Sequence, residues 1–341
     1  MARSSDVFEF ATAETLAKTG VGFVIAVALL ALVAAGIGVD RVVQTLADAH
    51  LRWIAAGCLS TFLCLLFWGK AWQVVLSVVG VSVPFRRLAV TYFAATFANY
   101  VTPLGQAGGE PFIAYVLARD TEASYEDSLA SVVTADLLNL LPFFSFAAVG
   151  LSVLLWRAQL PAAARPLVLG LFGLAVGVPL VALAGWLFRH AIRDGALRLM
   201  APVVARTDRI RLDSIRRRID DLYASFERIA AEPRALVGAL LFAYLGWVFF
   251  ALPLYFAGQA LDLPLSALLV LFVVPASTLA GIVPSPGGLG GVEVALVVLL
   301  LALAPLTAAE AYAVALVYRL ASYWFALVIG GVAALWVVRR A

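Results

Sequence analysis

Long apolar stretches separated by short charged segments run along most of the chain. Six of them can each supply roughly 20 apolar residues, enough for a helix to cross a bilayer core of about 30 Å. They are residues 20–39, 53–80, 127–156, 166–188, 235–260 and 309–338. This pattern predicts an all-α, polytopic membrane protein in which residues 1–341 form a single membrane domain.

The composition supports this fold class. The chain is 64% hydrophobic and 13% charged, whereas soluble domains carry about 25% charged residues. The two cysteines and two histidines are not spaced as a disulfide framework or a metal site. We therefore expect no metal, no cofactor and no nucleic-acid partner.

The placement of positive charge predicts the topology. Eleven of the 24 Lys and Arg residues lie between Arg189 and Arg234, and cytoplasmic loops carry an excess of such residues. We expect residues 189–234 to form a basic, partly amphipathic cytoplasmic linker. Lys18 and Arg339 then place both termini on the cytoplasmic side of a prokaryotic plasma membrane.

Two segments do not fit a simple alternation of spans. With the topology above, residues 88–118 begin and end inside, and residues 264–305 begin and end outside. Each is interrupted by glycine and proline, at 99–111 and at 284–293. The first break predicts a re-entrant helical hairpin. The second predicts either another re-entrant hairpin or two complete spans.

The two breaks resemble copies of each other. Residues 103–110 and 286–293 both begin with Pro and end with Glu seven residues later. Two glycine positions match within them: Gly105 with Gly288, and Gly108 with Gly291. Two repeats of opposite orientation, about 53–156 and 235–338, would account for this match. Broken helices at matching positions of inverted repeats indicate a transporter with its site near the bilayer midplane.

An intramembrane charge follows each break at the same distance. Asp136 comes 26 residues after Glu110, and Arg319 comes 26 residues after Glu293. Asp136 and Arg319 both fall roughly 15 Å deep in their expected spans. Charges at that depth are costly and are usually paired or functional. They would either pair with each other as a structural lock or contact a substrate.

The two motifs carry a resemblance to a known family. Residues 99–110, Asn-x3-Pro-Leu-Gly-x2-Gly-Gly-Glu, resemble the first signature of the lysylphosphatidylglycerol synthase transmembrane-region family. Residues 284–293, Pro-Ser-Pro-Gly-Gly-Leu-Gly-Gly-Val-Glu, together with Arg319 resemble the second. This family has a flippase-like domain and includes UPF0104-type membrane proteins. The resemblance covers nearly the whole chain.

The resemblance implies handling of a lipid with a polar headgroup. We expect a flippase or scramblase for a phospholipid, glycolipid or polyprenyl-phosphate-linked lipid. The alternatives are a membrane glycosyltransferase, which the absence of a nucleotide-binding pattern disfavours, and an accessory partner of a lipid-modifying enzyme. The family pattern has Arg and, three residues on, Asp where this chain has Asp136 and Asn139. The substrate of the aminoacylated-lipid members is therefore not carried over.

The breaks also predict a binding site. Helices that begin near Gly109 and Gly291 would point their N-terminal dipoles at an anion such as a phosphate, unless the glycines serve only close helix packing. Glu110 and Glu293 would cap these helix starts, bind a cationic headgroup or carry a proton. The expected substrate-binding residues are Asn99, Thr102, Gly105, Gly108, Gly109, Glu110, Asp136, Asn139, Gly287, Gly288, Gly290, Gly291, Glu293 and Arg319.

Overall fold

The structure of the chain is a computed structural model, and nearly all of the residues that it describes are helical. These are residues 20, 23–24, 28, 30–32, 34–78, 80–102, 114, 117, 125–157, 165–188, 191, 195, 224, 227–228, 231–282 and 285–340. No strand occurs among them. The expected all-α polytopic class is therefore confirmed.

Five helices in the described residues are long and apolar enough to cross a membrane. They are Leu51–Val78, Ser131–Val153, Pro233–Ala260, Pro286–Leu303 and Ala308–Val337. A sixth candidate, Leu30–Ile37 with Val39–Ala47, bends by 95° at its break. Gly38 lies at that bend, so the first apolar stretch ends close to its expected boundary. Four of the expected spans thus match four of these five helices closely.

The helices fall into two compact units, each built from separated parts of the chain. Unit 1 comprises Met1–Leu66, Ala89–Phe112 and Gly246–Ala341. Unit 2 comprises Phe67–Leu88 and Ile113–Leu245. Three helices run from one unit into the other: α3 (Leu51–Val78), α4 (Phe85–Val101) and α10 (Pro233–Ala260). The expected inverted repeat of residues 53–156 and 235–338 stays a prediction.

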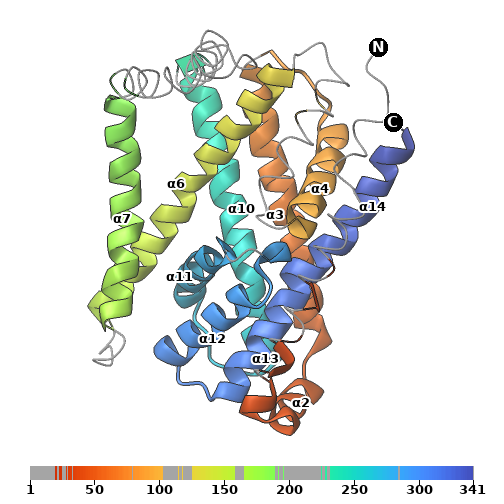
Figure 1. The fold of residues 1–341 in the computed structure, drawn as a ribbon, viewed down its shortest axis with the longest axis vertical. Helices are drawn as coiled ribbons and strands as arrows, with labels where there is room; N and C mark the ends of the chain where they lie inside the picture. The colour runs from red at the N-terminus through yellow and green to blue at the C-terminus, as the bar shows by residue number, and fades with distance from the viewer. Residues whose placement is uncertain are drawn as a thin grey trace, which may run out of the picture. The chain divides into compact units, whose positions relative to one another are not determined.

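Unit 1 contains the second glycine-rich break. Helix α11 (Ala267–Thr278) continues into the 3-10 turn η2 (Leu279–Ile282), and a second 3-10 turn, η3 (Pro286–Gly288), precedes helix α12 (Gly291–Leu303). Helix α12 packs against both α11 and α13 (Ala308–Arg319), and α13 also packs against α2 (Val39–Ala47) (Figure 1).

The two helices on either side of this break are short. With 12 and 13 residues, each helix extends about 20 Å, which is less than the hydrocarbon core of about 30 Å. The two helices also pack against each other on either side of the break. Because Pro286–Leu303 as a whole is long enough to cross a membrane, the choice between a re-entrant hairpin and two complete spans for residues 264–305 stays a prediction.

The last span is a single long helix with one local irregularity. After α13, residues Leu320–Trp324 form a π-helical turn, η4, and the helix continues as α14 (Phe325–Arg340). Single π turns inside α-helices are rare and are often found at functional sites. Arg319 is the residue immediately before this turn.

Unit 2 is dominated by two long helices that lie side by side (Figure 1). Helix α6 (Tyr125–Arg157) contains Pro142, and helix α7 (Arg165–Leu187) contains Pro179. Much of α7 consists of exposed leucine and valine side chains, as expected for a helix facing lipid. Most of the basic linker, 189–234, lies outside the described residues.

Candidate functional site

The candidate site is built around the second break, in unit 1. Pro286 begins the turn η3, and Gly287 and Gly288 follow with φ of 57° and 66°. Such left-handed conformations favour glycine. The side-chain hydroxyl of Ser285 donates to the carbonyl of Leu289 at 2.9 Å and closes the turn.

Space also requires glycine at these two positions. A Cβ atom on Gly287 would overlap the ring of Tyr323, and one on Gly288 would come within 2.8 Å of the Cα of Gly281. The tight-packing role considered for the glycines therefore applies here, and it holds the turn against the last span.

Glu293 is the carboxylate at the start of α12, and it is only 1% exposed. One oxygen, Oε2, accepts a hydrogen bond from the backbone N–H of Gly290 at 2.7 Å. This bond satisfies one of the backbone donors that a helix start leaves without an intrahelical partner. The capping role expected for Glu293 is thus present in the structure.

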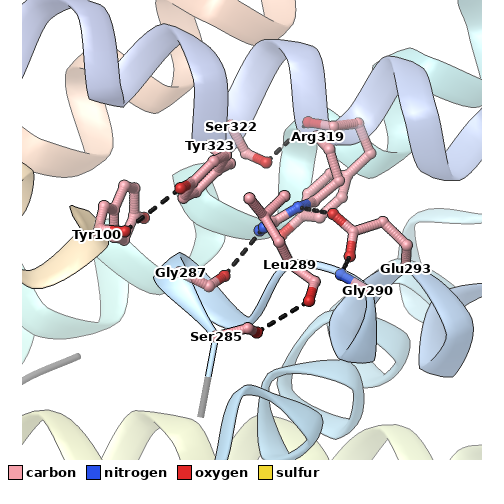
Figure 2. A network of polar contacts seen from close by, with 10 residues as sticks. Tyr100, Ser285, Gly287, Leu289, Gly290, Glu293, Arg319, Ser322 and Tyr323 are labelled. Carbon is pink, nitrogen blue, oxygen red and sulfur yellow. Dashed lines mark hydrogen bonds and ion pairs between the residues drawn. The ribbon is translucent and has the colours of Figure 1, made fainter. Parts of the chain in front are cut away.

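The other oxygen of Glu293 binds Arg319. The Nε of Arg319 donates to Glu293 Oε1 at 2.6 Å, and Nη2 donates to the carbonyl of Gly287 at 2.9 Å. Arg319 is 8% exposed. Its guanidinium also lies over the ring of Tyr323, with Cζ 4.3 Å from the ring centroid. Figure 2 shows Arg319 between Glu293 and the Gly287 turn.

This geometry corrects one alternative from the sequence. Arg319 was considered as a partner of Asp136, but the carboxylate that neutralises it is Glu293. Asp136 lies in unit 2, where its Oδ1 accepts a hydrogen bond from the indole N–H of Trp72 at 2.9 Å. Asn139 lies one turn further along α6.

The Arg319 guanidinium has more N–H donors than its hydrogen bonds to Glu293 and Gly287 use. It has five N–H donors, and two of them are used in the hydrogen bonds to Glu293 and Gly287. The remaining three have no partner among the residues that the structure describes. A planar, permanently charged group with free donors suits a phosphate or carboxylate oxygen.

The residues of the first motif are described only in part. Gly105, Gly108, Gly109 and Glu110 lie outside the described residues. The hydroxyl of Thr102 donates a hydrogen bond to the carbonyl of Ala98 at 2.7 Å. Its proton is therefore engaged at the end of the same helix. The side-chain oxygen of Asn99 is buried and has no hydrogen-bond partner in the described part of the chain.

Two site neighbours were not among the residues selected from the sequence. Tyr323 stacks on Arg319, and its position four residues further along the same span was a usable signal. Tyr100 packs against Tyr323 with ring centroids 5.0 Å apart. The two tyrosines are 223 positions apart in the sequence, so no local signal predicted their contact.

Comparisons with known proteins agree with this description. Residues 20–330 match the model of the lysylphosphatidylglycerol synthase TM region. The chain belongs to this family. It is therefore a multi-pass membrane protein of a type associated with lipid-related function.

Two curated relatives match over most of their length. A UPF0104 membrane protein of Pyrococcus horikoshii is 24% identical, over 91% of this chain and 94% of its own. A UPF0104 membrane protein of Methanothermobacter thermautotrophicus is 26% identical, over 92% of this chain and 94% of its own. The family resemblance found from the two motifs is confirmed.

Proposed function

We propose that this protein is a lipid transporter, a flippase or scramblase that moves a polar-headgroup lipid across the membrane. The observation that carries the proposal is the Arg319 guanidinium, which is buried, is fixed at the second glycine-rich break and has three N–H donors without a described partner. Membership of a family associated with lipid-related membrane function supports it.

The proposed substrate group is the phosphate of the lipid headgroup. A phosphate oxygen can accept two parallel N–H bonds from arginine, and the interaction is strengthened where water is excluded. Glu293 is the counter-charge of Arg319, so the pair has little net charge before the lipid arrives. Phospholipids and polyprenyl-phosphate-linked lipids share this phosphate.

The surroundings of the site are part of the same proposal. We assign the protein to a prokaryotic plasma membrane with both termini in the cytoplasm, because the basic residues cluster between 189 and 234 and at 339–340 and such residues favour the cytoplasmic side. A lipid-modifying enzyme that makes or consumes the transported lipid is the proposed partner.

A vesicle assay tests the transport proposal. The purified chain is reconstituted with fluorescently labelled phosphatidylglycerol or phosphatidylethanolamine, and dithionite then bleaches the label that reaches the outer leaflet. We expect the wild-type protein to make inner-leaflet label accessible faster than protein-free vesicles do. If no labelled phospholipid and no labelled polyprenyl phosphate moves faster than in empty vesicles, the proposal is wrong.

Variants of Arg319 connect transport to the site. Arg319→Gln should abolish lipid movement, and Arg319→Lys should restore it only in part, because lysine supplies a point charge without the two-pronged geometry. Arg86→Gln is the matched control, since it removes one exposed arginine outside the site. Wild-type transport by a well-folded Arg319→Gln variant would exclude Arg319 from the site.

The same vesicles separate the transporter from the enzyme alternative. Addition of a nucleotide sugar together with a polyprenyl phosphate should give no glycosylated lipid. Sugar transfer without movement of any labelled lipid would instead identify a membrane glycosyltransferase.

A further inference from the structure

Tyr323 lies at the centre of the contacts that surround Arg319 (Figure 2). The residue is 1% exposed. One set of its contacts is with the Arg319 guanidinium, whose Cζ lies 4.3 Å from the ring centroid, and another is with the ring of Tyr100 at 5.0 Å. Figure 2 shows the Tyr323 side chain between Tyr100 and the Gly287 turn.

Tyr323 lies within the π-helical turn of the last span. Leu320–Trp324 form the π turn directly after Arg319. A π turn holds more residues than an α turn because its hydrogen bonds span i→i+5. The turn therefore gives Arg319 and the residue four positions on a different angular spacing from that of a regular α-helix.

The Gly287 turn completes this arrangement. Arg319 Nη2 donates to the carbonyl of Gly287, and the Tyr323 ring occupies the space where a Cβ on Gly287 would lie. The ring, the guanidinium and the turn therefore contact one another mutually. A shift of the Tyr323 ring would remove the aromatic cover from the guanidinium, which would then be held by Glu293 and the Gly287 carbonyl alone.

The hydroxyl of Tyr323 extends the contacts to another helix. It donates to the backbone carbonyl of Tyr100 at 3.3 Å. Tyr100 lies in the last turn of α4 (Phe85–Val101), where carbonyls lack intrahelical donors. The chain continues from this turn into the first glycine-rich motif, so Tyr323 connects the second motif with the helix that leads to the first.

We propose that Tyr323 is a positioning residue: its ring fixes the Arg319 guanidinium, and its hydroxyl ties Arg319 and the Gly287 turn to the C-terminal end of α4. This deepens the proposed function and rests on it, since it names the residue that would hold Arg319 in place for the lipid headgroup. The structural part of the proposal is tested without any lipid, and therefore independently of transport.

The first experiment measures how well Arg319 is covered. The full-length protein in detergent is treated with phenylglyoxal, which modifies arginine, and the modification of Arg319 is quantified by peptide mass spectrometry relative to exposed Arg86. Tyr323→Leu should raise the relative rate at Arg319 by more than threefold. Tyr323→Phe keeps the ring and should restore wild-type protection.

The second experiment measures the tie to α4. Hydrogen–deuterium exchange is followed in the peptide that contains the last turn of α4. Tyr323→Phe should raise its exchange rate by more than twofold. Tyr312→Phe is the matched control, because it removes another tyrosine hydroxyl bond to a distant backbone carbonyl, that of Leu30 at 2.7 Å. The control should leave the α4 peptide unchanged.

The outcomes decide the proposal whatever the transport assay gives. A rise of threefold or less at Arg319 in Tyr323→Leu, or of twofold or less in α4 exchange in Tyr323→Phe, would overturn it. If Tyr323→Leu does not fold, the exchange measurement on Tyr323→Phe decides alone. Confirmed positioning in a protein that moves no labelled lipid would count against the proposed function, not against the role of Tyr323.

Discussion

The two intramembrane charges of this chain are held in different ways. Arg319 in unit 1 is almost fully buried and binds a carboxylate, a backbone carbonyl and an aromatic face. Asp136 in unit 2 is half-buried and accepts a hydrogen bond from the indole of Trp72. The first is a buried ion pair, and the second includes a hydrogen bond from a neutral indole.

The difference bears on what each region can tolerate. Loss of one member of a buried ion pair leaves an uncompensated charge, which is strongly destabilising. Loss of the charge on Asp136 leaves a neutral partner that an amide oxygen can still satisfy. The region around Arg319 is thus constrained by both charge and shape, whereas the hydrogen bond between Trp72 and Asp136 requires only an acceptor.

The largest effect is expected from Glu293→Gln. It leaves Arg319 without its counter-charge and should lower the free energy of unfolding by about 3–5 kcal/mol, measured by denaturant titration in detergent. Glu310→Gln is the matched control. Glu310 also caps a helix, accepting from the backbone N–H and the hydroxyl of Thr307, but no arginine is paired with it in the described residues.

Glu310→Gln should lower the free energy of unfolding by about 1 kcal/mol or less, which is the usual contribution of a helix cap. Equal losses in Glu293→Gln and Glu310→Gln would mean that the ion pair contributes nothing beyond capping. The contrast between the two charged regions would then disappear.

A smaller effect is expected from Gly287→Ala. The left-handed φ of 57° and the overlap with the Tyr323 ring together should cost about 2–4 kcal/mol in unfolding free energy. Gly170→Ala in α7 is the control, because a Cβ there meets nothing within 4 Å. That control should be neutral or slightly stabilising. A neutral Gly287→Ala would show that the turn can move away from Tyr323.

The smallest effect is expected from Asp136→Asn. The amide oxygen can replace the carboxylate as acceptor for Trp72, so unfolding free energy should change by less than about 1 kcal/mol. Asp136→Leu removes the acceptor and should cost about 1–3 kcal/mol. A loss from Asp136→Asn as large as that from Glu293→Gln would show that the charge of Asp136 is structurally essential, and that the two regions are alike.

The sequence by itself determined the fold class, four of the long helices and the position of the second break. In a bilayer, the backbone N–H and C=O groups of a single apolar run can find hydrogen-bond partners only if the run is helical. The helices at residues 53–80, 235–260 and 309–338 could therefore be predicted with nearly correct bounds. Gly287 and Gly288 could be selected as site residues from a local signal of another kind, because repeated glycine beside proline interrupts a helix.

Only the tertiary structure decided the partners of the charges. Sequence spacing placed Arg319 and Asp136 at similar depth, but depth does not specify which helix faces which. Helix packing put Glu293 against Arg319 and Trp72 against Asp136. The role of Tyr323 likewise depends on Tyr100, 223 residues away. Contacts between distant segments depend on how all the helices pack together, and no local pattern encodes them.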